Sequence, residues 1–199
     1  MTIGTLLDNI RNNHLESFAE KLDSLDDEGL SFDPEVALVD DSGALTLDGA
    51  LALPRRVDVE VEDPETGVFE ELDIPSDKLY AFPPITVDWT AHMRVVFSPF
   101  RWEACRVTAE GILSGHNLDD LKQWYLNWFD VEDNELPEDE DGECDGFHEV
   151  VHSLSDPVME ESMLSFEVDL GSAPIEAFDG LLDALSAMGA RQVKLTLSE

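Results

Sequence analysis

Apolar and polar positions along this chain follow two different periods, and the change of period marks the expected elements. In the first 25 residues the apolar positions recur at helical spacing, which predicts an amphipathic helix over residues 5–25. Thr5, with Asp8 three residues later, is the expected N-terminal cap, and Gly29 is the expected end of the helix. The apolar positions are Leu7, Ile10, Leu15, Phe18, Leu22 and Leu25.

The apolar period changes to two between Val36 and Ile74, which indicates β-strands. Within this stretch, residues 57–62 alternate Val with Asp or Glu, so we expect one apolar and one acidic strand face. The turn residues 63–67 predict a hairpin that continues into Val68–Ile74. Residues 86–97 and 102–113 are again β-like and are joined by a short Ser-Pro connection, which favours an antiparallel meander.

The second half of the chain predicts two more helices. Asn117 is placed to cap a helix over residues 118–129. Residues 164–170 alternate as a strand, Pro174 begins a helix that Gly189 ends, and residues 193–197 form a last strand. This order predicts a β-α-β unit. We therefore expect one α+β domain over residues 1–199, with a mostly antiparallel sheet packed by an N-terminal, a central and a C-terminal helix.

Charge is the property that bears most on binding partners. The 199 residues contain 46 Asp and Glu against 11 Lys and Arg, a formal net charge of −35. Such a field repels nucleic-acid phosphates and anionic lipids and attracts basic proteins. The sequence therefore predicts no nucleic-acid or membrane partner. Three explanations of the acidity stay open: solubility or adaptation to high salt, a surface that covers a basic partner or imitates DNA, and local metal binding by carboxylates.

Location and redox state follow from what the sequence lacks. No basic leader precedes an apolar run, and no apolar stretch approaches about 18 residues, so we expect a cytoplasmic protein. Cys105 and Cys144 are the only cysteines, too few for a disulfide framework, and we expect two free thiols.

The densest charge lies in an expected solvated loop over residues 130–146. Ten of the sixteen residues from 130 to 145 are acidic, and such a run repels itself. We expect a cationic partner to bind this loop together with the acidic strand face near Asp58–Glu71. The predicted partner-binding residues are Asp130, Glu132, Asp133, Glu135, Glu138, Asp139, Glu140, Asp141, Glu143 and Asp145.

Immediately after this loop, His148-Glu149-Val150-Val151-His152 resembles the H-E-x-x-H signature of zinc-dependent metallopeptidases. The resemblance implies a zinc hydrolase in which His148 and His152 bind the metal and Glu149 is the base. That chemistry requires a helix, because on a strand the two histidines lie about 13 Å apart. Adjacent valines and the following Ser-Asp-Pro favour a strand. The pattern cannot identify a third ligand.

Two further patterns are weaker. Asp141, Glu143, Asp145 and Gly146 imitate the start of an EF-hand loop, but His152 stands where a bidentate Glu is required, so the pattern does not predict a calcium site. In residues 89–109 three arginines are interleaved with aromatic residues. We expect sheet-core aromatics, with the arginines paired to carboxylates, instead of a nucleic-acid platform.

The sequence thus predicts a non-enzymatic acidic binding protein, with an immunity protein or inhibitor that occludes a basic toxin or nuclease as its most specific form. No catalytic residue, metal ligand or cofactor is assigned. The alternatives are a metallopeptidase-like zinc hydrolase and an acidic housekeeping domain from a halophile.

Overall fold

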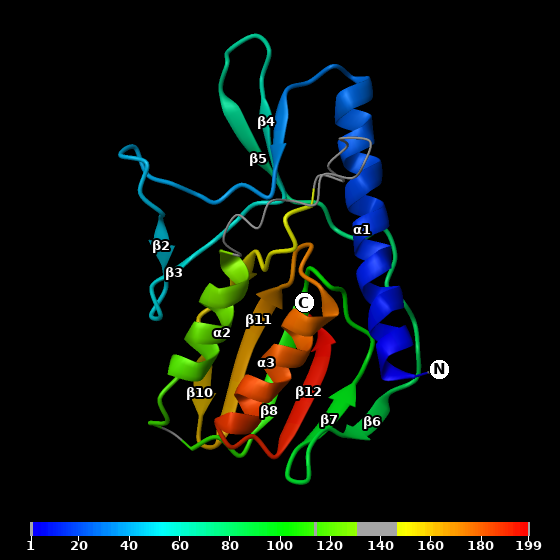
Figure 1. Ribbon diagram of the computed structural model, residues 1–199, viewed down its shortest axis with the longest axis vertical. Helices are drawn as coiled ribbons and strands as arrows, with labels where there is room; N and C mark the ends of the chain where they lie inside the picture. The colour runs from blue at the N-terminus through cyan, green and yellow to red at the C-terminus, as the bar shows by residue number, and fades with distance from the viewer. Residues whose placement is uncertain (1, 114, 131–146, 199) are drawn as a thin grey trace.

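The computed structural model describes residues 2–113, 115–130 and 147–198 (Figure 1). The chain has the predicted α+β architecture. The described part of the chain contains helices α1 (Ile3–Asp27), α2 (Asp119–Phe129) and α3 (Ile175–Ala187), which are the N-terminal, central and C-terminal helices expected from the sequence. Among the described residues, none of these helices combines the length and the apolar run that a membrane crossing needs.

A mixed sheet forms the centre of the molecule. Its strands are arranged in the order β10-β11-β8-β12-β7-β6, and the short β9 (Ser153–Leu154) also pairs with β11. All neighbours are antiparallel except β12 and β7, which are parallel. The bounds are β6 (Ile85–Asp88), β7 (Arg94–Phe97), β8 (Cys105–Glu110), β10 (Val158–Glu160), β11 (Met163–Asp169) and β12 (Gln192–Leu197).

Helices α2 and α3 cover one face of this sheet, and α1 runs along its side (Figure 1). Alternate strand residues such as Val107, Phe166 and Val193 are buried against the helices. The opposite face carries half-exposed polar side chains that include the ion pairs Arg106–Glu167 and Lys194–Glu110. The sheet is therefore apolar on the helix side and polar on the other, as expected of an antiparallel sheet covered on one face only.

The predicted β-α-β unit is present, because β11, α3 and β12 follow one another and both strands belong to one sheet. However, β8 lies between β11 and β12 and is antiparallel to both. The predicted meander is wrong at this point, since β12 separates β7 from β8. A short connection favours the pairing of strands that are neighbours in sequence, here β7 and β8. It gives no sign that a strand from later in the chain, here β12, will insert between them.

A second, smaller sheet packs against the C-terminal half of α1. It contains β1 (Phe32–Pro34), β4 (Val59–Glu62) and β5 (Phe69–Leu72), and β4 and β5 form the predicted hairpin. The buried side chains between this sheet and α1 are Phe18, Leu25, Val59 and Ile74. Strands β2 (Leu47–Asp48) and β3 (Leu53–Pro54) form a separate two-stranded sheet at one side of the molecule. Helix α1 thus contributes Leu6, Leu7 and Ile10 to the hydrophobic core of the main sheet, and Phe18 and Leu25 to the hydrophobic cluster of the smaller sheet.

Several local predictions are confirmed or corrected. Thr2, and not Thr5, is the N-terminal cap of helix α1, because the Thr2 hydroxyl accepts the Thr5 N–H at 3.2 Å. Gly29 ends this helix with φ +69°, as expected. The β-like stretch 86–97 consists of two strands separated by a turn. The aromatics Phe97 and Trp102 are buried as predicted.

Residues 147–152 adopt neither the helix nor the strand considered for the H-E-x-x-H segment, and only β9 continues it as a strand. Glu149 has φ +58°, which is incompatible with either regular element.

Candidate functional site

His152 lies at the centre of a buried charged cluster. Its side chain is fully buried, its Nδ1 lies 2.8 Å from Asp58 Oδ1, and its Nε2 lies 2.8 Å from Glu35 Oε1. Asp169 Oδ2 is 4.0 Å from the same Nδ1. We call Glu35, Asp58, His152 and Asp169 the His152 cluster. Three carboxylates therefore surround one imidazole in the interior of the protein.

The cluster joins four separate segments of the chain. Glu35 follows β1, Asp58 precedes β4, His152 precedes β9, and Asp169 ends β11. Backbone hydrogen bonds hold these segments together, because the Glu35 N–H donates to the Asp58 carbonyl at 2.6 Å and the Arg56 N–H donates to the His152 carbonyl at 2.9 Å. The cluster thus sits where the small sheet meets the main sheet.

Backbone amides fix the remaining oxygens of the carboxylates. Asp58 Oδ2 accepts the Ile74 N–H, and Asp169 Oδ1 accepts the Gly171 N–H at 2.9 Å. Glu35 accepts the backbone N–H groups of His148 and Ser172 in addition to the His152 contact. Each carboxylate is therefore held in one orientation, with one oxygen directed at the imidazole or close to it.

The environment sets the charge of each group. Burial lowers the pKa of His152, but its hydrogen bonds to Asp58 and Glu35 outweigh burial and raise the pKa to about 10. Burial also opposes ionisation of Glu35, yet the hydrogen bond from His152 brings the pKa of Glu35 below its usual value. Burial raises the pKa of Asp169 to about 7, although 26% of its side chain remains exposed. The hydrogen bonds to Asp58 and Glu35 therefore favour the imidazolium form of His152.

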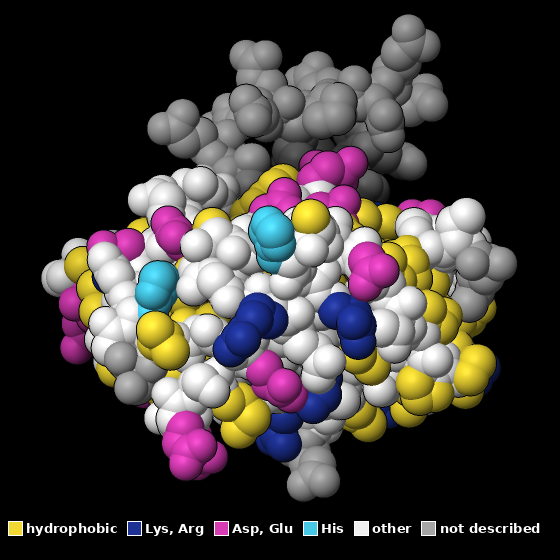
Figure 2. All heavy atoms as spheres, turned by 90° about the horizontal axis from the view of Figure 1, so that it is seen from below, with side chains coloured by type: hydrophobic (Ala, Val, Ile, Leu, Met, Phe, Trp, Pro, Cys, Tyr) yellow, Lys and Arg dark blue, Asp and Glu magenta, His cyan; other side chains and the backbone are white. Residues whose placement is uncertain are grey.

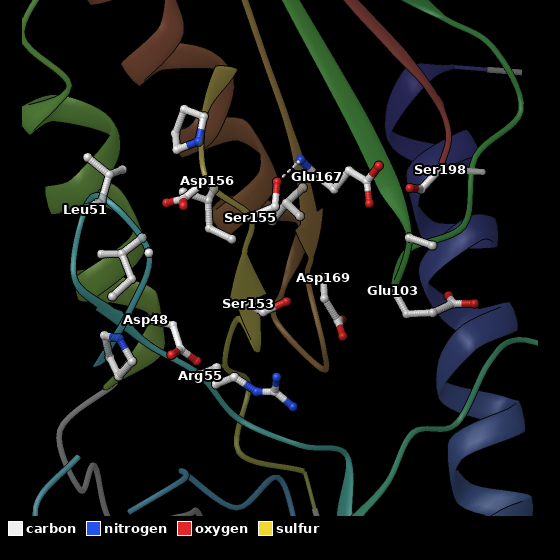
Figure 3. Close-up of a pocket in the computed structure, with 17 residues that line it drawn as sticks. Asp48, Leu51, Arg55, Glu103, Ser153, Ser155, Asp156, Glu167, Asp169 and Ser198 are labelled. Atoms are coloured by element: carbon white, nitrogen blue, oxygen red, sulfur yellow. Dashed lines mark hydrogen bonds between the residues drawn. The ribbon is translucent and has the colours of Figure 1, made fainter. Parts of the chain in front are cut away.

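An open cavity of about 550 Å³ borders the cluster, and its lining includes Asp58, Asp169, Arg55 and Glu103. A neighbouring cavity shares Asp169, Arg55 and Glu103 with it. Figure 3 shows the lining of this neighbouring cavity, in which the Asp169 carboxylate lies near Ser153 and the guanidinium of Arg55 reaches toward it from the segment after β3. Solvent and small solutes thus have access to one side of the cluster.

A second buried histidine lies beside this cavity. His14 on α1 is fully buried, and its Nδ1 is 3.4 Å from Glu103 Oε2. Among the described residues neither ring nitrogen makes a hydrogen bond, because the approach to Glu103 has the distance of an ion pair but not the geometry of a hydrogen bond. Burial lowers the pKa of His14. Glu103 itself accepts the Ser76 N–H and hydroxyl at 2.8 and 2.7 Å.

The structure separates the residues of the H-E-x-x-H pattern. The side chains of His148 and Glu149 are exposed, whereas His152 is buried and uses both ring nitrogens. The helix that would place both imidazoles on one face is absent, so the geometry that the zinc signature requires is not formed.

Of the predicted partner-binding residues, the structure describes one. Asp130 is exposed directly after α2. The other predicted residues, Glu132, Asp133, Glu135, Glu138, Asp139, Glu140, Asp141, Glu143 and Asp145, lie outside the described residues, as does the EF-hand-like segment 141–146.

Sequence reasoning missed three members of the cluster, Glu35, Asp58 and Asp169. Asp58 was expected on an exposed acidic strand face, but only 3% of it is exposed, so that prediction is wrong at this position. Its carboxylate turns inward because His152 and the Ile74 N–H offer buried partners. Strand alternation carries no sign of those partners, and only His152 could be singled out, through its motif.

Comparison with protein-family models, with curated proteins and with solved structures found no match to this chain. Functional inference therefore rests on the residues themselves.

Proposed function

We propose that this protein binds a basic protein partner through its acidic surface, as an immunity protein or inhibitor that occludes a basic toxin or nuclease would. The observation that carries the proposal is an exposed acidic surface on the C-terminal half of α1 and on the β4–β5 hairpin, which we call the acidic lobe. These two elements share one hydrophobic cluster and are therefore adjacent. The exposed carboxylates of the acidic lobe are Glu16, Glu20, Asp23, Asp26, Asp27, Glu28, Asp33, Glu65, Glu70, Glu71 and Asp73.

Little positive charge compensates this lobe. Among the described residues, its carboxylates take part in one ion pair, in which Arg55 Nη2 lies 3.5 Å from Glu71 Oε2, and both side chains of that pair are about half exposed. Such an exposed pair contributes little. The field of the lobe is therefore available to attract a cationic surface and to accelerate its association.

Apolar side chains lie within the acidic surface. Val68 and Phe69, at the start of the edge strand β5, are 59% and 49% exposed. Protein interfaces combine a few exposed aromatic or aliphatic anchors with a polar rim. Phe69, which is followed by Glu70 and Glu71, has the position of such an anchor.

Many cations of the chain are engaged elsewhere. Arg11, Arg56 and Lys122 donate to backbone carbonyls. Arg94 lies 3.6 Å from Asp88 in an ion pair on the main sheet. At the end of the molecule shown in Figure 2, Lys and Arg side chains are mixed with Asp and Glu. These cations therefore do not compensate the carboxylates of the acidic lobe.

The test separates the acidic lobe from net charge alone. One variant neutralises three lobe carboxylates (Glu20→Gln, Asp23→Asn, Glu70→Gln), and a matched variant neutralises three exposed carboxylates elsewhere (Asp41→Asn, Asp88→Asn, Glu160→Gln). Partners are captured on each purified protein from lysate of the source cells at low salt and identified by mass spectrometry. We expect a basic partner that binds the wild type and the matched variant and that binds the lobe variant at least about tenfold more weakly.

Salt and the remaining acidic segment complete the design. Capture should fall when salt rises to about 0.5 M, where the Debye length is a few ångströms. A third variant replaces residues 131–145 by a neutral linker, which tests the contribution of that segment to binding. The proposal fails if no basic partner is captured, if salt has no effect, or if the two triple variants and the wild type bind equally.

A further inference from the structure

We infer that Asp58, His152 and Asp169 form a binding site for one divalent transition-metal ion, with Zn²⁺ as the ion that fits the donors best. Each residue offers one ligand atom, and these atoms all lie within 4.8 Å of one another. They are His152 Nδ1, a carboxylate oxygen of Asp58 and a carboxylate oxygen of Asp169. The site is independent of the acidic lobe and of the partner proposed above.

Each of the three ligands is already oriented by a second contact. Glu35 Oε1 lies 2.8 Å from His152 Nε2 and can accept its proton, which leaves Nδ1 to face Asp58 and Asp169. The Ile74 and Gly171 amides hold the second oxygens of Asp58 and Asp169. Metal-binding histidines commonly donate their other N–H to a carboxylate, and metal-binding carboxylates are commonly hydrogen-bonded in turn. The His152 cluster has this arrangement at all three positions.

The charge balance of the cluster also favours a cation. Glu35 interacts electrostatically with Arg56, whose guanidinium donates to the Glu35 carbonyl at 2.6 Å. The carboxylates of Glu35, Asp58 and Asp169 surround the single imidazole of His152. Buried carboxylates are costly unless they are paired or bound to a metal. A divalent cation between Asp58 and Asp169 would give both carboxylates a partner.

An ion can reach the site and keep open coordination positions. Asp58 and Asp169 both line the open cavity beside the cluster, and Asp169 is 26% exposed. Fully buried His14 lies 3.4 Å from Glu103, which lines the same cavity, and among the described residues the ring nitrogens of His14 lack hydrogen-bond partners. Three protein ligands with solvent on one side is the arrangement of zinc sites that retain a water-derived ligand.

The donor set decides the type of metal. One imidazole nitrogen with two carboxylate oxygens suits Zn²⁺ better than Mg²⁺ or Ca²⁺, which prefer oxygen ligands alone. Binding breaks the hydrogen bond between His152 Nδ1 and Asp58 Oδ1. The Nδ1 proton leaves to solvent, and the nitrogen lone pair and the Asp58 oxygen then coordinate the ion.

This ligand set differs from the one that the H-E-x-x-H pattern implies. His152 is shared by the two sets, but here its partners are Asp58 and Asp169, and exposed His148 takes no part. His148→Ala is therefore a matched control, since it removes an imidazole of the same motif without touching the inferred ligands.

The experiment is calorimetric titration of the full chain with ZnCl₂ after treatment with a chelator and dialysis. About 0.3 M NaCl and millimolar MgCl₂ suppress diffuse binding by exposed carboxylates. We expect one Zn²⁺ per chain for the wild type and for His148→Ala. Asp169→Asn and Asp58→Asn should each bind Zn²⁺ at least about tenfold more weakly, and Glu35→Gln should do so by a similar factor through the orientation of His152.

Folding of the variants is checked by circular dichroism. Asp169→Asn is the most informative, because Asn retains an oxygen for the Gly171 N–H and the position is partly exposed. Visible absorption of bound Co²⁺ reports the coordination directly and should be present in the wild type and lost in folded Asp169→Asn. The inference is overturned if no saturable binding is seen, if folded Asp169→Asn binds as tightly as the wild type, or if His148→Ala abolishes binding.

Discussion

Gly171 allows a sharp test of the packing around His152, because the backbone has no room there for a side chain. A Cβ at this position would lie 2.3 Å from His152 Cδ2, 2.5 Å from His152 Nε2 and 2.6 Å from the Val150 carbonyl oxygen. The residue also has φ +51°, in the left-handed region. Gly171→Ala must therefore adopt an unfavourable backbone conformation and displace both the imidazole and a backbone carbonyl.

Two contributions set the magnitude. A left-handed conformation costs an L-residue about 1–2 kcal/mol, and overpacking of a well-packed interior costs about 1–3 kcal/mol. Gly171→Ala should thus lower the free energy of unfolding by about 2–5 kcal/mol. Gly29→Ala is the matched control, because Gly29 has φ +69° and a Cβ added there would have no other atom within 4 Å. It should lose the backbone contribution alone, about 1 kcal/mol.

Urea unfolding followed by tryptophan fluorescence and far-ultraviolet circular dichroism measures the difference. With a denaturant dependence of about 2 kcal/mol per molar urea, the Gly171→Ala midpoint should fall by about 1–2.5 M, and the Gly29→Ala midpoint by about 0.5 M. Equal midpoints for the two variants would refute the reasoning, because the contacts of the Cβ with His152 and Val150 would then have no energetic weight.

Three further variants test other parts of the structure. Tyr125→Phe should cost about 1–3 kcal/mol in urea unfolding, since the hydroxyl contacts the Pro54 and His152 carbonyls at 2.5 and 3.0 Å, and an unchanged midpoint would contradict this role. Glu35→Gln should lower the free energy of unfolding by about 3 kcal/mol, because it leaves His152 with fewer buried counter-charges. Urea unfolding checks this value, with Asp33→Asn as the exposed control. Phe69→Ala should change the free energy of unfolding by less than about 0.5 kcal/mol but weaken capture of the basic partner, and undiminished capture would exclude Phe69 as an anchor.

Local signals in the sequence predicted most of the elements. The apolar stripe of α1, its end at Gly29, the β4–β5 hairpin and helix α3 after Pro174 are all present. Such features depend on residues within a few positions of one another, through periodicity, caps and turn residues. Residues 147–152 form neither the helix nor the strand considered for them, because their buried residues pack where the small sheet meets the main sheet.

The sequence by itself therefore determined the α+β class, the order of the helices and hairpins, and the excess of negative charge. Only the tertiary structure decided that β12 inserts between β7 and β8, and that Asp58 turns inward to meet His152 from 94 positions away. Strand periodicity shows which residues share a face, but it does not show which strands pair or which distant polar group will satisfy a buried carboxylate. The His152 cluster depends on both, so it exists only once the two sheets have packed together.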